Sequence, residues 1–234
     1  MPRPASTLEA DPVLVHLTDP KRTGTRPSPL PHRPPGSIRR TLAVKRAFDY
    51  GLAAALLVVA APLVGVCAIL VRLTSRGPAF YSQERVGQFG RVFTIYKLRT
   101  MYHQCERLTG PKWSVPGDPR VTPFGRFLRA THLDELPQLV NVLRGQMSLI
   151  GPRPERPEIA AHLAKSIEDY NARSAVLPGI TGHAQVHLPP DTSVADVRDK
   201  MLLDRYYLGR LSMWFDVVTL LRTGLKVVGA YRTQ

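Results

Sequence analysis

The sequence is poor in cysteine, in aromatic residues and in acidic residues. Its two cysteines, Cys67 and Cys105, form no CxxC pair and are too few for a disulfide framework, which indicates a reduced, cytoplasm-facing protein. The composition also excludes the collagen-like and coiled-coil classes. Aspartate and glutamate number 18 against 32 lysines and arginines, a net charge of +14. Such an excess predicts an anionic partner: nucleic acid, an anionic membrane surface or a phosphorylated substrate.

Composition changes sharply along the 234 residues, a length that allows one ordinary domain with appendages. Residues 1–36 contain nine prolines and almost no apolar clusters. Such a stretch cannot bury enough surface to offset the entropy lost on ordering. We therefore predict a disordered, proline-rich tail over 1–38, a membrane segment over 39–76 and a cytosolic domain over 77–234.

The membrane segment is predicted from an uncharged run of 22 residues, 50–71. As a helix it would reach about 33 Å, enough for the hydrocarbon core of a bilayer, and it fits this role better than that of a buried soluble helix. Pro62 at its midpoint removes a backbone hydrogen bond and kinks the helix. Both flanks are basic. Two interpretations stay open: a kinked spanning helix, or a re-entrant hairpin that keeps both flanks on the cytoplasmic leaflet.

The rest of the chain predicts an α/β fold that is rich in helix and has a small mixed sheet. Strands are expected at 79–83 and 92–98, with a turn at Gly87-x-x-Gly90, and 103–122 is read as a long loop. Helices are expected from Pro123, then up to Leu143 with Gly145 as C-cap, over 158–172, over 194–207 and from Ser212. The last helix carries Arg222 and Lys226 opposite an apolar face, which either packs on the core or lies in the membrane interface.

The candidate chemistry centres on Asp134 and Glu135, adjacent in THLDELPQLVNVLRG and in the first turn of an expected helix. Acidic residues there often only complement the helix dipole. The surrounding sequence favours a functional interpretation, because it is rich in cations: Lys97, Arg99, Arg126, Arg129, Arg144, Arg153 and Arg156. A carboxylate pair among so many cations is typical of a site for a polyanion and a divalent metal.

Two other ligand classes are disfavoured. His183 and His187 are four residues apart, but Gly182 and Pro189 argue against a helix there and no third ligand is evident, which disfavours zinc. The basic residues lack interleaved aromatics and any nucleic-acid-reading motif, so no nucleic acid is expected as a partner.

Several ordered motifs identify a family resemblance. They are KRAFDYGLA, GPAFYSQERVG, F-x-IYKLRTM, DPRVTPFGRFLRATHLDELPQLVNVLRGQMSLIGPRPE, LPGITGHAQV and LDRYYL…S-x-WFD, which together cover about residues 45–228. The chain resembles the bacterial sugar transferase family, the small monotopic phosphoglycosyl transferases. The resemblance implies transfer of a sugar 1-phosphate from a UDP-sugar to undecaprenyl (polyprenyl) phosphate with release of UMP. This is the first membrane step of exopolysaccharide, O-antigen or glycoprotein glycan synthesis, at the cytoplasmic face of the bacterial inner membrane.

The resemblance also implies roles for individual residues. Asp134 matches a nucleophile that forms a covalent phosphosugar intermediate, and Glu135 matches a Mg²⁺ ligand. Arg129 and Arg153 match arginines that hold the phosphate and uridine ends of the nucleotide, and Pro62 matches the break of a re-entrant membrane helix. The full set of implied substrate-binding residues is Lys97, Arg99, Arg129, Pro152, Arg153 and Pro154.

The chain departs from the family pattern in one motif. Many members read GWAQVNGR where this chain reads GHAQVHLP, so His183 replaces a tryptophan and Pro189 replaces an arginine. Arg198 and Lys200 are candidates for the missing cation. A non-catalytic scaffold of the same fold is the alternative function, and the intact Asp134–Glu135 pair argues against it. Membrane lipid is an expected partner, and a homodimer stays open.

Overall fold

The structure is a computed structural model that describes residues 36–105, 114–115, 117–191 and 193–229. The first described element is α2 (Gly36–Thr74), a helix of 39 residues. The tail expected over 1–38 lies outside the described residues, except that its last three positions already belong to α2. Among the described residues, α2 is the one helix long and apolar enough to cross a membrane, by length and composition. Only 17% of its most apolar window is buried.

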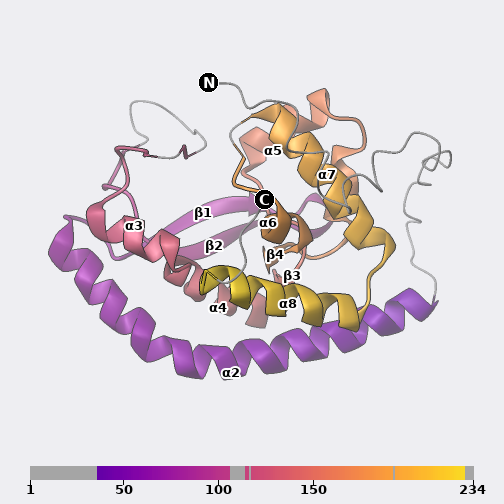
Figure 1. Cartoon of the computed structure of the whole chain (residues 1–234), viewed down its shortest axis with the longest axis horizontal. Helices are drawn as coiled ribbons and strands as arrows, with labels where there is room; N and C mark the ends of the chain where they lie inside the picture. The colour runs from indigo at the N-terminus through magenta and orange to yellow at the C-terminus, as the bar shows by residue number, and fades with distance from the viewer. Residues whose placement is uncertain (1–35, 106–113, 116, 192, 230–234) are drawn as a thin grey trace.

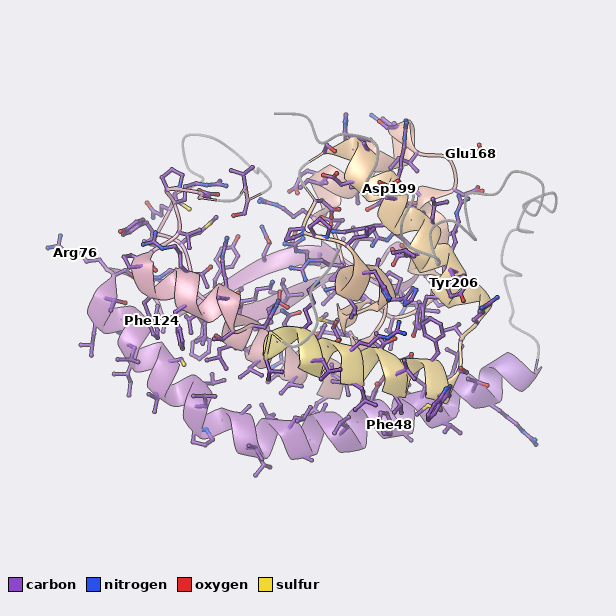
Figure 2. All side chains as sticks on the ribbon, in the orientation of Figure 1. Phe48, Arg76, Phe124, Glu168, Asp199 and Tyr206 are labelled. Carbon is purple, nitrogen blue, oxygen red and sulfur yellow. The ribbon has the colours of Figure 1, made fainter. Side chains whose placement is uncertain are left out.

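Helix α2 differs from the expected helix-break-helix, because it continues through Pro62 without a break. It forms a long arc along one side of the molecule, with α4 and α8 between it and the strands (Figure 1). A proline removes one backbone donor, and the flanking alanines and leucines are good helix formers, so a single proline can bend a helix without ending it. Side chains project from the outer side of the arc, and Arg76 points away from its end (Figure 2).

The remaining helices largely follow the expected order. The α-helices are α3 (Pro123–Ala130), α4 (Leu139–Leu143), α5 (Pro157–Ser166), α6 (His183–His187), α7 (Val194–Gly209) and α8 (Met213–Val227). The 3₁₀ helices are η2 (Gln88–Gly90), η3 (Leu133–Gln138) and η4 (Tyr170–Ala175). The helix expected over 158–172 is wrong in its second half. Ile167 is extended and Asp169 is left-handed, so the chain turns there and re-enters a 3₁₀ helix.

The β-structure consists of two small sheets of opposite sense. Strands β1 (Phe80–Val86) and β2 (Val92–Leu98) form an antiparallel hairpin, joined by the turn expected between Gly87 and Gly90. Strands β3 (Ser148–Ile150) and β4 (Gly179–Thr181) are parallel. Neither was expected, since three residues carry too short a pattern to be recognised. A Cβ at Gly179 would collide with the backbone of Gly151, so glycine is required where these strands meet.

Helix α2 is part of the hydrophobic core. Ala53 and Ala60 belong to a cluster with residues of β2, α4, β3 and α7, and Phe215 and Leu220 of α8 pack against it. Nearer the end of α2, Cys67 and Val71 pack with Leu98 and Leu128. The inner side of the helix therefore packs on the domain along most of its length, while its outer side carries exposed side chains: Val58, Val59, Leu63, Val66, Ile69 and Leu73.

A buried polar network fixes the first half of α2 to the domain. The Lys45 ammonium lies 2.7 Å from Oδ2 of Asp216 on α8 and 3.5 Å from Asp49. The Ser148 hydroxyl of β3 donates to Asp49 at 2.6 Å, and the Tyr207 hydroxyl of α7 donates to Asp216 at 3.0 Å. One lysine therefore neutralises two buried carboxylates, one on α2 and one on α8. These carboxylates also accept hydrogen bonds from β3 and α7, so the network joins four elements of the fold.

We expect Lys45→Met to destabilise the protein by about 3–5 kcal/mol, because it leaves buried carboxylates without their counter-ion. Thermal unfolding in detergent measures the loss, and Lys165→Met serves as control because Lys165 is exposed on α5. A Lys45→Met protein as stable as the Lys165→Met control would show that the network contributes nothing.

Candidate active site

The two acids lie in a short 3₁₀ helix rather than in the first turn of an α-helix. Asp134 and Glu135 belong to η3, which leads directly into α4. His132 precedes η3 in a left-handed conformation, with φ of 56°. This left-handed residue separates η3 from α3, and Pro137 lies inside η3, two residues before α4 begins at Leu139.

Glu135 is held by two cations from distant parts of the chain. Its Oε1 lies 2.6 Å from the Lys97 ammonium on β2 and 3.1 Å from the Arg153 guanidinium, which follows β3. Burial alone would raise the pKa of Glu135, but Lys97 and Arg153 lower it well below its usual range. Glu135 is therefore a firmly ionised carboxylate, and it ties the hairpin to the segment after β3.

Asp134 has the opposite environment. Its side chain is buried, and none of its carboxylate oxygens accepts a hydrogen bond from another described residue. Burial raises its pKa to about 6, with Glu135 adding to the rise and Lys97, Arg129 and Arg153 opposing it. Of the two adjacent acids, Glu135 is therefore paired with two cations, and Asp134 has no hydrogen-bond donor among the described residues. Perturbed acids of this kind are concentrated at functional sites.

Arg129 supplies a further cation beside Asp134. It lies near the end of α3, five residues before Asp134. Burial lowers the pKa of its guanidinium, and the negative charge of Asp134 opposes that effect. Its Nε donates to Thr100 at 2.9 Å and its Nη1 donates to Ser114 at 2.7 Å. These neutral partners orient the guanidinium without cancelling its charge.

The Pro-Arg-Pro segment is fixed through its backbone. The Pro152 carbonyl accepts from Gly179 of β4 at 3.0 Å, and the Pro154 carbonyl accepts from Arg85 at 3.1 Å. The carbonyl of Arg153 itself accepts from Arg173 at 2.9 Å. The two prolines therefore hold the segment that presents Arg153, whose side chain is 37% exposed and so remains accessible to a ligand.

The hydrogen bonds of Arg99 go to the residues that follow α2 rather than to the acid pair. Its guanidinium donates to the carbonyls of Ser75 and Arg76 and to the Ser75 hydroxyl. These carbonyls lie at the end of α2, where a helix leaves its last acceptors without partners. Arg99 therefore fixes the end of α2, and the substrate contact that the resemblance implies stays a prediction.

The substitutes considered for the missing arginine are already engaged. Lys200 pairs with Asp191 at 2.8 Å, and Arg198 is exposed and donates to the Ser166 carbonyl at 3.3 Å. The rings of His183 and His187 contact each other at a tilt of 58°, with their centroids 4.3 Å apart. Burial lowers the pKa of His183 to about 3, so this histidine is neutral and packs as an aromatic ring.

Sequence reasoning missed two contributions to the site. The cations Arg85 and Arg173 support the Pro-Arg-Pro backbone, and Lys226 of α8 acts electrostatically on His132. The sequence showed that Arg222 and Lys226 share one face of a helix, but it did not show that this face contacts α6.

The acids also suit a divalent cation. Oε2 of Glu135 and both oxygens of Asp134 have no hydrogen-bond donor among the described residues, which leaves hard oxygen ligands of the kind that Mg²⁺ prefers. No group of three or more histidine, cysteine, aspartate or glutamate side chains that could hold a metal occurs in the described part of the chain. A cation here would need further oxygens, such as those of a substrate phosphate.

Comparison with known proteins accounts for this arrangement. The sequence profile described as bacterial sugar transferase matches residues 40–230. The chain belongs to this family.

Three similar proteins show what relatives of this chain are named for. An undecaprenyl-phosphate glucose phosphotransferase of Komagataeibacter xylinus is 42% identical over 74% of this chain and 34% of the relative. A UDP-N-acetylgalactosamine-undecaprenyl-phosphate N-acetylgalactosaminephosphotransferase of Aeromonas hydrophila is 40% identical over 77% of this chain and 42% of its own. A UDP-glucose:undecaprenyl-phosphate glucose-1-phosphate transferase of Caulobacter vibrioides is 43% identical over 82% and 73%. The chain thus spans less than half the length of the first two relatives.

We expect Asp134→Asn to stabilise the protein at pH 8. The folded-state pKa of about 6 exceeds the ordinary value, so the folded state prefers the protonated acid and loses stability as the pH rises through that range. The penalty is on the order of 2–3 kcal/mol. Thermal unfolding without Mg²⁺ should give a higher Tm for the variant at pH 8 and equal values near pH 3.

Asp169→Asn is the matched control, because Asp169 is exposed and left-handed, a conformation that asparagine accepts. An Asp134→Asn protein no more stable than wild type at pH 8 would contradict the raised pKa assigned to Asp134.

Proposed function

We propose that the protein transfers a sugar 1-phosphate from a UDP-sugar to undecaprenyl phosphate and releases UMP. The observation that carries the proposal is the unequal acid pair: Asp134 has no hydrogen-bond donor among the described residues, while Glu135 is held by Lys97 and Arg153. The names of relatives from three genera, which combine undecaprenyl phosphate with a sugar phosphate, support the same reaction.

The proposed reaction has two displacement steps at one phosphorus atom. An oxygen of the Asp134 carboxylate attacks the phosphorus next to the sugar, the bond from that phosphorus to the bridging oxygen breaks, and UMP leaves with the electron pair. A phosphate oxygen of the lipid then attacks the same phosphorus and releases the Asp134 carboxylate. Neither step requires proton transfer to the protein. Covalent catalysis of this kind lets a water-soluble donor and a membrane acceptor use one site in turn.

The surrounding cations reduce the repulsion between a carboxylate and a diphosphate. Arg129 and Arg153 would bind the phosphate and uridine portions of the donor through charge-assisted bonds, and Lys97 keeps Glu135 ionised. Mg²⁺, held by Glu135 and the diphosphate, would supply additional charge neutralisation. Burial of Asp134 leaves its carboxylate poorly solvated and therefore more reactive when ionised.

The decisive assay measures UMP release from a panel that includes UDP-glucose and UDP-N-acetylgalactosamine, with undecaprenyl phosphate and Mg²⁺. Asp134→Asn should abolish turnover at every Mg²⁺ concentration, because an amide cannot form the acyl phosphate. Glu135→Gln should leave residual activity that rises with added Mg²⁺, since it weakens a metal ligand. Asp169→Asn and Glu158→Gln, both at exposed side chains, are the controls. Wild-type protein that is folded yet releases no UMP would favour the scaffold.

We further propose that α2 is re-entrant, with both flanks on the cytoplasmic face of the inner membrane. Support comes from its two ends, which contact the same domain: Lys45 pairs with Asp216, and Arg99 bonds the carbonyls of Ser75 and Arg76. A helix with ends on opposite sides of a bilayer could not keep both contacts. The exposed outer side of α2 would then enter one leaflet, and the basic flanks would contact anionic lipid headgroups.

Cysteine labelling tests this topology in a background without Cys67 and Cys105. Ser37→Cys and Ser82→Cys should both resist a membrane-impermeant maleimide on intact cells, because both positions would face the cytoplasm. Both should react after lysis. Labelling of the Ser37→Cys protein alone in intact cells would establish a spanning helix.

A further inference from the structure

Helix α8 has one apolar side exposed and one basic side turned toward the domain. The exposed side chains follow the helical repeat, so that they share one side of α8. They are Trp214, Leu221, Leu225 and, just beyond the end of the helix, Val228. Arg222 and Lys226 are half-buried on the other side. The contact between Asp216 and Lys45 places α8 beside the proposed membrane helix, and the exposed apolar side chains lie on a different side of α8 from Asp216.

Both cations on α8 are positioned by neutral groups of α6. The Lys226 ammonium donates to the carbonyls of Gln185 and Val186 at 2.7 and 3.2 Å. The Arg222 guanidinium lies 3.0 Å from Nε2 of His187, whose Nδ1 is 2.8 Å from the His183 carbonyl. Because Nδ1 must donate to that carbonyl, Nε2 accepts from the guanidinium and His187 is neutral.

Neither cation is neutralised by a carboxylate within the described residues. Lys45, Lys97 and Lys200, the more deeply buried lysines, each pair with an aspartate or glutamate. Burial lowers the pKa of Lys226, and nearby Lys200 lowers it further. Two half-buried positive charges without an acidic partner are costly unless an anion binds beside them.

Helix α8 also contacts the strand that supports the Pro-Arg-Pro segment. The hydroxyls of Thr223 on α8 and Thr181 on β4 lie 3.0 Å apart, and the Thr181 carbonyl accepts from the Gly151 amide at 3.0 Å. Gly151 lies two residues before Arg153, which donates to Glu135. The side of α8 that carries Arg222 and Lys226 therefore adjoins the backbone that presents Arg153 to the proposed active site.

We propose that Arg222 and Lys226 bind the phosphate of the isoprenoid lipid acceptor where it enters the active site, while its hydrocarbon tail lies in the bilayer along Trp214, Leu221 and Leu225. This assignment rests on the proposed transferase function and adds to it the edge by which the acceptor arrives. Charge and polarity both fit this occupant, which carries one anionic phosphate on an apolar chain. A nucleotide donor has no apolar chain for the exposed stripe.

The kinetic test compares the two substrates. In an Arg222→Gln/Lys226→Gln protein, the KM for undecaprenyl phosphate should rise roughly ten- to a hundred-fold, as expected for the loss of charge-assisted bonds to phosphate. The KM for the UDP-sugar should change less than about twofold. Arg222→Lys/Lys226→Arg should restore most of the acceptor affinity, because it keeps both charges. Lys165→Gln, at an exposed lysine of α5, controls for the loss of positive charge.

A binding measurement separates this inference from the transferase proposal. Farnesyl phosphate, farnesol and inorganic phosphate are titrated calorimetrically into the full chain in detergent. Wild type should bind farnesyl phosphate more tightly than either other probe, and the double glutamine variant should lose its preference for farnesyl phosphate over farnesol.

The outcomes are distinct. An equal rise in both KM values, or a lowered Tm with no change in the farnesyl phosphate preference, would assign Arg222 and Lys226 to the structural support of α6 and overturn the inference. If no UDP-sugar yields UMP, the transferase proposal fails, and the titration still decides whether α8 binds an isoprenoid phosphate.

Discussion

A single carboxylate oxygen, Oε1 of Glu135, accepts bonds from Lys97 on β2 and Arg153 beyond β3. This contact joins the antiparallel hairpin, the 3₁₀ helix η3 and the segment after the parallel strands, none of which is large enough to be fixed by its own core. It also determines the difference between the acids. Because Glu135 takes the two cations as direct partners, Asp134 is left buried with a raised pKa. The raised pKa of Asp134 therefore depends in part on the charge of Glu135.

Helix α2 is fixed to the same part of the fold. Lys45 neutralises Asp216 on α8, and Asp49 receives the hydroxyl of Ser148 on β3, the strand that leads to Arg153. A buried charge network of this kind stabilises little on net but penalises every arrangement in which a partner is missing. The position of α2 on the domain and the position of Arg153 in the site are therefore coupled, which suits the proposed transfer to a membrane acceptor.

Much of this was predictable from local pattern. The helices α3, α7 and α8 follow apolar periodicity and caps such as Thr122, Ser193 and Ser212. The Asp134–Glu135 pair was found because charge and motif lie close in sequence. Long-range pairing was not readable: Arg99 belongs to a basic motif, yet it bonds the end of α2. Strands β3 and β4 were too short to recognise, and the proline at position 62 concealed the helix-forming residues around it, through which α2 continues.

The central claim is that Asp134, alone among the acids, carries the sugar phosphate between donor and acceptor. Intact-mass measurement of the protein, incubated with its UDP-sugar and Mg²⁺ but no lipid, tests it most directly. The account predicts a gain of one sugar-phosphate mass that maps to Asp134, is absent from Asp134→Asn and disappears when undecaprenyl phosphate is added. Product formation without any adduct, in a kinetic pattern that requires both substrates bound together, would contradict it and make Asp134 a metal ligand.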